Sequence, residues 1–111
     1  DGTEYLDAYN HVPSVGHAHP RVAAAIAEHA ATVSTHTRYL DEGLIAYAET
    51  LLAALPAGLD ALSLTCTGSE ANDLALRVAR HATGNRGVLV TRHAYHGVTA
   101  AVAEVSPSLG G

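Results

Sequence analysis

The residues best suited to chemistry gather in one short stretch, TCTGSEAND, which covers residues 65–73. Thr67 and Ser69 carry hydroxyl groups on either side of Gly68, which has no side chain. The apolar run 61–65 precedes these residues and helix-forming residues follow them, so the pattern predicts a strand, a turn and a helix. The first turn of a helix leaves backbone N–H groups without partners and carries a partial positive charge. The turn is therefore a candidate cradle for a phosphate or a carboxylate.

A plain helix cap explains the same residues without any ligand. Thr67 followed three residues later by Glu70 is the capping-box pattern, in which a hydroxyl and a carboxylate satisfy free N–H groups of the helix. The glycine spacing fits neither the Walker pattern nor G-x-G-x-x-G, which disfavours the nucleotide-binding loops. From these residues alone, anion binding and simple capping both stay open.

A second group of useful side chains, Tyr95 and His96 with Gly97 after them, follows another apolar run at 87–91. The order strand, helix, strand predicts a right-handed crossover with two parallel strands. Ligands in open α/β sheets gather beyond the carboxyl ends of such strands, so we expect both turns at one edge of the sheet. A cradle beside a tyrosine indicates a phosphorylated ligand whose aromatic ring stacks on Tyr95.

The elements that position these turns are predicted from periodicity and turn residues. Alternating residues predict a strand over 4–9, Pro20 suits the first turn of a helix, and Gly84 is expected as a left-handed cap. Helices with at least one apolar face are expected at 21–33, 41–55 and 71–82, and another helix is expected to start within 98–105. The helix over 21–33 should bury one edge, and the helix over 41–55 should bury a broad face. The expected fold class is α/β.

Composition limits the size, the partners and the compartment. A chain of 111 residues is one modest domain or a piece of one, and its start at Asp1 and its end at Gly110 and Gly111 favour a piece. The net charge of −5 argues against a nucleic-acid groove or an anionic membrane surface. One cysteine allows no internal disulfide, and no apolar run reaches membrane-spanning length. We expect a cytoplasmic protein without nucleic-acid or membrane partners.

Histidine and cysteine side chains raise two further possibilities, a metal site and a thiol nucleophile. Two pairs of histidines could each offer two nitrogen ligands to a metal, His17 with His19 and His93 with His96. No compact third ligand accompanies either pair. We therefore expect no metal site. Cys66 ends a strand that is predicted to be buried and has no histidine near it in the sequence, so we expect a small core residue.

Several motifs occur in the order and spacing of a known family. They are YLD at 5–7, GHAHP at 16–20, THTRYL at 35–40, GSEAND at 68–73 and AYHG at 94–97. Together they resemble the class III aminotransferases, fold-type-I enzymes that use pyridoxal 5′-phosphate (PLP), over nearly the whole chain. The segments 10–13 and 38–40 are most similar to a branch that contains aminotransferases and phospholyases acting on phosphoethanolamine or phosphohydroxylysine.

The resemblance implies cofactor-binding roles for five residues. Gly68 and Ser69 would bind the PLP phosphate through backbone N–H and hydroxyl groups, with Thr67 beside them. Tyr95 would stack on the pyridine ring, and His96 would lie close behind that ring.

Other positions stay open even with the resemblance. Glu70 would either lie near the cofactor pocket or act only as a helix cap. Arg38 would bind a substrate carboxylate, contact a neighbouring subunit or lie in solvent. The family more often has Asn and Ser where this chain has Cys66 and Thr67, so Thr67 keeps the hydroxyl while Cys66 lacks the amide.

The resemblance also implies an architecture and a reaction. Residues 1–40 would form an N-terminal strand-and-helix segment, and residues 41–111 the incomplete beginning of the PLP-binding large domain. The full-length enzyme, expected to be a homodimer, would transfer an amino group between an amino acid or amine and a 2-oxo acid. The alternatives are phosphate elimination from an amino-alkyl phosphate on the same scaffold, and a non-catalytic fragment.

This chain contains no lysine, because all six of its Lys and Arg positions are arginines. PLP chemistry needs a lysine for the Schiff base and a carboxylate against the pyridine nitrogen. In the family both come from a later part of the large domain. We therefore expect the isolated chain to be inactive and to supply only the phosphate cup and the ring-stacking residues.

Overall fold

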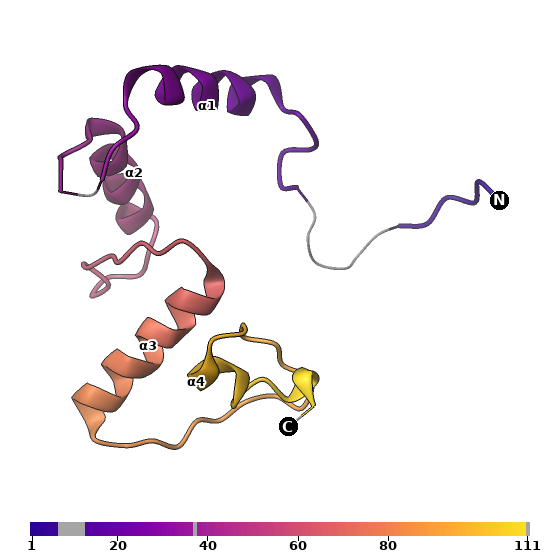
Figure 1. The fold of residues 1–111 in the computed structure, drawn as a ribbon, viewed down its shortest axis with the longest axis vertical. Helices are drawn as coiled ribbons and strands as arrows, with labels where there is room; N and C mark the ends of the chain where they lie inside the picture. The colour runs from indigo at the N-terminus through magenta and orange to yellow at the C-terminus, as the bar shows by residue number, and fades with distance from the viewer. Residues whose placement is uncertain (7–12, 37, 111) are drawn as a thin grey trace. The chain divides into compact units, whose positions relative to one another are not determined.

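The computed structural model describes residues 1–6, 13–36 and 38–110. Within them the chain forms four α-helices and one 3-10 helix, which are α1 (Pro20–Thr32), α2 (Glu42–Ala53), α3 (Gly68–Thr83), α4 (Ala100–Ala103) and η1 (Pro107–Leu109) (Figure 1). The chain divides into two compact units, Asp1–Ile45 and Ala46–Gly111. No helix in the described ranges is long and apolar enough to cross a membrane.

Helix α1 belongs to the first unit and begins at Pro20, as predicted. The fixed φ of proline suits the first helical position, where a missing N–H costs nothing. The helix ends at Thr32, whose hydroxyl donates back to the carbonyls of Glu28 and His29, and Val33 then takes an extended conformation. None of its residues is buried, so the predicted buried edge is wrong for the part of the chain described here.

Helix α2 begins after Asp41, whose carboxylate accepts a hydrogen bond of 2.8 Å from the N–H of Leu44 and whose carbonyl accepts the N–H of Ile45. This is an N-cap, and the same carboxylate lies 3.8 Å from His29 Nε2 at the end of α1. The prediction of a helix over 41–55 is confirmed to within the end residues. The broad face that was expected to be buried is wrong for the described residues, because none of the residues of α2 is buried.

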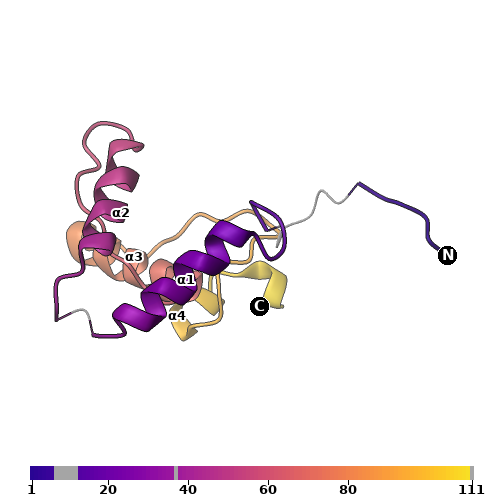
Figure 2. The same ribbon diagram turned by 90° about the horizontal axis from the view of Figure 1, so that it is seen from above.

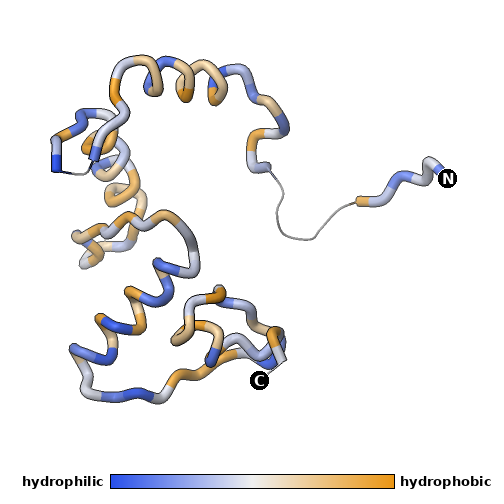
Figure 3. Tube along the Cα trace, in the orientation of Figure 1, coloured by the Kyte–Doolittle hydropathy of each residue, from blue (hydrophilic) through white to orange (hydrophobic). Residues whose placement is uncertain are grey.

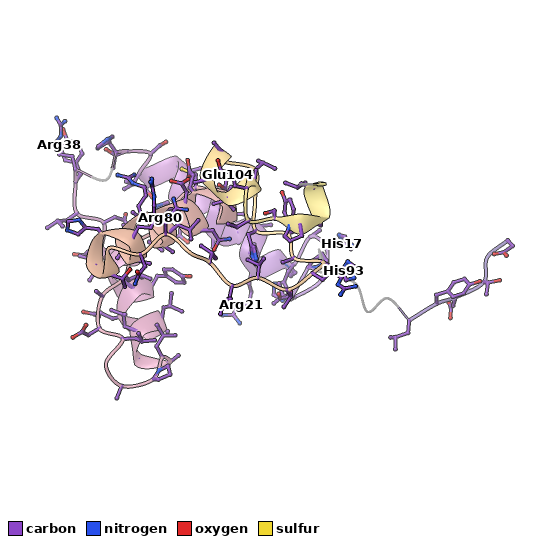
Figure 4. All side chains as sticks on the ribbon, turned by 90° about the horizontal axis from the view of Figure 1, so that it is seen from below. His17, Arg21, Arg38, Arg80, His93 and Glu104 are labelled. Carbon is purple, nitrogen blue, oxygen red and sulfur yellow. The ribbon has the colours of Figure 1, made fainter. Side chains whose placement is uncertain are left out.

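Helix α3 is the longest helix, with polar and apolar positions alternating along it (Figure 3). It begins at Gly68, directly after the N-cap Thr67 that the capping-box pattern predicts, and the periodic residues 71–82 lie within it. Its end at Thr83 is as predicted, since Gly84 has a φ of 70° and donates its N–H to the carbonyl of Arg80. Arg80, labelled in Figure 4, lies in the last turn, where a positive charge favours the helix dipole.

The predicted strands over 61–65 and 87–91 are wrong for this structure, in which no strand is assigned among the described residues (Figures 1 and 2). Residues 4–6 are not a strand either, and 7–9 lie outside the described residues. A strand forms only where a neighbouring strand accepts and donates its backbone hydrogen bonds, and these segments find no such neighbour within the described chain. The predicted α/β class is therefore represented here by its helices alone.

The best-packed region is the C-terminal part of the second unit, where α4 contacts α3. Val102 and Ser106 are almost fully buried, at 0% and 2% exposed, and Gly97 is buried beside them. The two apolar runs lie outside this core, because Leu64 and Leu89 are 51% and 102% exposed. The division of the chain at 40/41 refers to the complete enzyme fold and stays a prediction.

The exposed apolar runs lead to a prediction for the 111-residue chain by itself. We expect it to be poorly folded or to self-associate, because the leucine and valine side chains at 64 and 88–90 are 38% to 102% exposed. Full burial of one such side chain contributes about 1.5–3 kcal/mol, so losing half of several rivals the whole stability of a domain. Sedimentation at several concentrations and thermal unfolding test this. A sharp two-state melt from a dilute monomer would contradict it.

Candidate functional site

The N-terminus of α3 is capped by its own side chains, as the sequence predicted. Thr67 is the N-cap, and its Oγ1 accepts a hydrogen bond of 3.2 Å from the N–H of Glu70. The Glu70 carboxylate accepts a bond of 2.9 Å from the N–H of Cys66, one residue earlier than in the standard capping box. Glu70 therefore acts as a cap in this structure, and the turn before the helix is held at both ends.

The cap leaves several donors free at this helix end. The N–H groups of Gly68 and Ser69 have no acceptor within the described residues, since the intrahelical bonds begin further along. The hydroxyls of Thr67 and Ser69 each accept a bond and keep their own proton for a further acceptor. Two amides and two hydroxyls thus gather at the positive end of a sixteen-residue helix, where an anion is stabilised.

Gly68 is not required by the packing of this chain. A Cβ added there would meet no atom within 4 Å, and the residue does not have a left-handed φ. Gly68 is the first residue of α3, directly after the N-cap Thr67. The absent side chain leaves the approach to the free N–H groups open, which fits the close binding of a phosphate.

The loop that carries Tyr95 and His96 is attached directly to this helix end. The N–H of Val98 donates to Ser69 Oγ at 3.1 Å, and the side-chain amide of Asn72 donates to the carbonyl of His96 at 2.7 Å. The Thr99 hydroxyl adds a bond of 3.1 Å to the carboxylate of Asp73. The structure therefore brings together the two turns that the sequence singled out.

Gly97 is required where the loop meets the helix. Its φ is +130°, and an added Cβ would lie 2.5 Å from Ser69 Oγ and 2.7 Å from Ser69 Cα. Both the conformation and the space exclude a side chain.

The two candidate ring-binding residues have different surroundings. Tyr95 is 60% exposed, which leaves its ring accessible. His96 is half-buried and lines a cavity of about 290 Å³ together with Asn72 and Val102. The stacking of Tyr95 on a cofactor ring and the place of His96 behind it stay predictions.

Sequence reasoning missed Ser106, which is 2% exposed and accepts a hydrogen bond of 3.0 Å from the N–H of His96. Asn72 belongs to the GSEAND motif, but the motif alone does not reveal its hydrogen bond to the carbonyl of His96. The only signal for Ser106 is its place before Pro107, and that signal marks a turn rather than a partner.

The expectation for Cys66 is wrong, because the thiol is exposed rather than packed in a core. The reason is the unpaired segment before it, which was predicted to be a buried strand. Among the described residues, no group of three or more His, Cys, Asp and Glu side chains is placed to hold a metal ion. Arg38 donates its backbone N–H to His36 Nδ1, and the role of its guanidinium stays open.

The contact between Gly97 and Ser69 gives a testable prediction for the full-length protein. Gly97→Ala should lower the free energy of unfolding by about 2 kcal/mol or more, because the added Cβ collides with Ser69 at an unfavourable φ. Gly87→Ala is the matched control, since a Cβ there meets nothing within 4 Å. Denaturant unfolding of both variants decides the matter, and equal stabilities would contradict the contact.

Comparison with known proteins shows the family. The family profile described as aminotransferase class-III matches residues 1–108. The chain is 48% identical over 107 residues to an "Alanine--glyoxylate aminotransferase 2-like" protein of Drosophila melanogaster, covering 96% of this chain and 22% of that protein. It is 43% identical over 104 residues to "Ethanolamine-phosphate phospho-lyase homolog 1" of Caenorhabditis elegans, covering 94% of this chain and 22% of the relative.

A solved structure agrees with these relatives. A phospholyase from Arthrobacter in complex with phosphoethanolamine superposes with a TM-score of 0.86 at 54% identity, over 95% of this chain and 25% of that one. The chain thus spans about a fifth to a quarter of the proteins it matches. It belongs to the class III aminotransferases, a PLP-dependent family.

Proposed function

We propose that this chain supplies the phosphate cup and the ring wall of the cofactor site in a longer PLP enzyme. The observation that carries the proposal is the set of free donors at the start of α3, with the Tyr95 loop hydrogen-bonded beside it. A plain cap would account for Thr67 and Glu70. It would not account for a glycine that the packing does not require.

Each residue of the cup has a distinct task in this proposal. The N–H groups of Gly68 and Ser69 bind phosphate oxygens, and the hydroxyls of Thr67 and Ser69 donate further hydrogen bonds to them. Tyr95 offers its ring face to the pyridine ring, and His96 supports the loop behind it. The cup binds a dianion through backbone N–H and hydroxyl groups and has no basic side chain of its own. A local site of this kind does not need a positively charged surface, and the chain as a whole has a net charge of −5.

The bound cofactor supplies an electron sink for the carbon next to the substrate amine. The chain contains no lysine, so the lysine and the carboxylate that faces the pyridine nitrogen belong to the rest of the enzyme in this proposal. The enzyme is proposed to be a cytoplasmic homodimer in which residues 1–40 precede the large domain. Light scattering of the full-length protein tests the dimer, and a monomer would contradict it.

The proposed reaction is amino-group transfer between an amino acid or amine and a 2-oxo acid. It is supported by the family and by the relative that is named as an aminotransferase. Phosphate elimination from an amino-alkyl phosphate is the second candidate, and a specific observation favours it. The Arthrobacter structure, at 54% identity, is a phospholyase with phosphoethanolamine bound. Both reactions use the same phosphate cup.

An assay of the full-length enzyme separates the two reactions. With alanine and glyoxylate as the test pair, amino-group transfer predicts pyruvate and glycine, with turnover that depends on the 2-oxo acid. With phosphoethanolamine alone it predicts no inorganic phosphate. Release of phosphate without a 2-oxo acid would contradict transfer and support the second candidate. If no pair of amine and 2-oxo acid exchanged an amino group and no amino-alkyl phosphate released phosphate, both candidates would fail.

The phosphate cup is tested by Gly68→Val in the same enzyme. A branched side chain in front of the free N–H groups removes one or two charge-assisted hydrogen bonds of about 1.5–3 kcal/mol each. PLP binding should therefore weaken by about one to several decades. The PLP dissociation constant and the melting temperatures of the apo and holo forms are the measurements.

Tyr95→Phe is the matched control, because it keeps the ring face and should leave PLP affinity largely unchanged. If the turn only caps its helix, Gly68→Val will lower both melting temperatures equally and leave the dissociation constant alone. That result would refute the cup.

A further inference from the structure

We propose that Ser106 and Asn72 are positioning residues for the cofactor ring. They hold His96 by its two backbone groups and so fix the loop that carries Tyr95 against the cradle. The inference rests on the proposed function and assigns a task to two side chains that touch neither the phosphate cup nor the cofactor ring in that proposal. We call these two hydrogen bonds to His96 the His96 clamp.

Ser106 forms the buried half of the clamp. Its Oγ accepts a hydrogen bond of 3.0 Å from the N–H of His96 and donates its proton to the carbonyl of Val102 at 2.8 Å. The hydroxyl is 2% exposed, so water does not replace it as a partner when it is removed. This single oxygen connects the loop to α4, and the carbonyl of Gly97 lies 3.5 Å away as a weaker second acceptor.

Asn72 forms the surface half of the clamp. Its side-chain amide donates to the carbonyl of His96 at 2.7 Å. Asn72 lies three residues after Ser69 on α3, so both side chains are on one face of the helix. The helix that carries the free phosphate donors therefore also fixes the backbone of His96, one residue after Tyr95.

The clamp acts on the ring wall and not on the cup. Its loss leaves the N–H groups of Gly68 and Ser69 in place, because α3 and its cap do not depend on His96. Ser69 Oγ keeps its own hydrogen bond from the N–H of Val98, which is separate from the clamp. It removes the fixed position of the peptide next to Tyr95. A ligand with a ring should therefore respond to the loss, while a bare phosphate should not.

The test uses Ser106→Ala, Asn72→Ala and both together in the full-length enzyme. The probes are PLP and inorganic phosphate, the latter measured by competition with PLP for the apoenzyme. We expect each single variant to weaken PLP binding by about threefold to tenfold and to change visible circular dichroism per bound cofactor, with phosphate affinity unchanged. The double variant should lose no more than the worse single variant, because both act through one residue.

Ser108→Ala is the matched control, since Ser108 contributes its backbone N–H to the carbonyl of Ala94 and alanine keeps that bond. It should leave all three quantities at the wild-type value. Should Ser106→Ala fail to fold, Asn72→Ala carries the same test from an exposed position.

Two results would overturn the clamp. In the first, both variants have a lower melting temperature but keep the wild-type PLP affinity and dichroism, and the two residues then have a structural role only. In the second, phosphate affinity falls in parallel with PLP affinity, which places the effect in the cup. Failure of the proposed function looks different, because the wild type itself would then show no PLP affinity, or Gly68→Val would not reduce it, and both proposals would fall.

Discussion

The close approach of Gly97 to Ser69 is the constraint on which the candidate site depends. A bond of 3.1 Å from the N–H of Val98 to Ser69 Oγ holds the loop against the first turn of α3, and glycine at 97 permits the approach because a Cβ there would collide with Ser69. Without this approach, the start of the helix would be an ordinary cap. With it, the free amides and Tyr95 belong to one local framework, in which Ser69 serves both the helix end and the loop.

Helices were readable from the sequence because their signals are local. Pro20 starts α1, Thr67 and Glu70 start α3, and Gly84 ends it, each through contacts within a few residues. The strands were not readable in the same way. A strand is completed by a neighbour that is distant in sequence, so the apolar runs at 61–65 and 87–91 predicted burial that the described chain does not provide.

The residues of the candidate site also differ in whether local sequence signals reveal them. Residue type and spacing pointed to Thr67, Gly68 and Ser69 as anion donors, and the loops of the crossover pointed to Tyr95 and His96. The supports of these residues were missed, because Asn72 bonds a carbonyl 24 residues away and Ser106 bonds an N–H ten residues away. Neither partner is a side chain, so no pairing of residue types could have revealed them.

The donors of the cup have a consequence for how affinity responds to pH and to mutation. Backbone N–H groups and hydroxyls do not gain or lose protons in the ordinary range, so the part of the affinity that they supply follows the ionisation of the phosphate itself, with a second pKa of about 6. Such a cup is also insensitive to charge reversal on the surrounding surface beyond a Debye length. Phosphate binding by this cup depends on the shape of the first turn of α3. Substitutions that add atoms to that turn or bend it are therefore the ones that abolish binding.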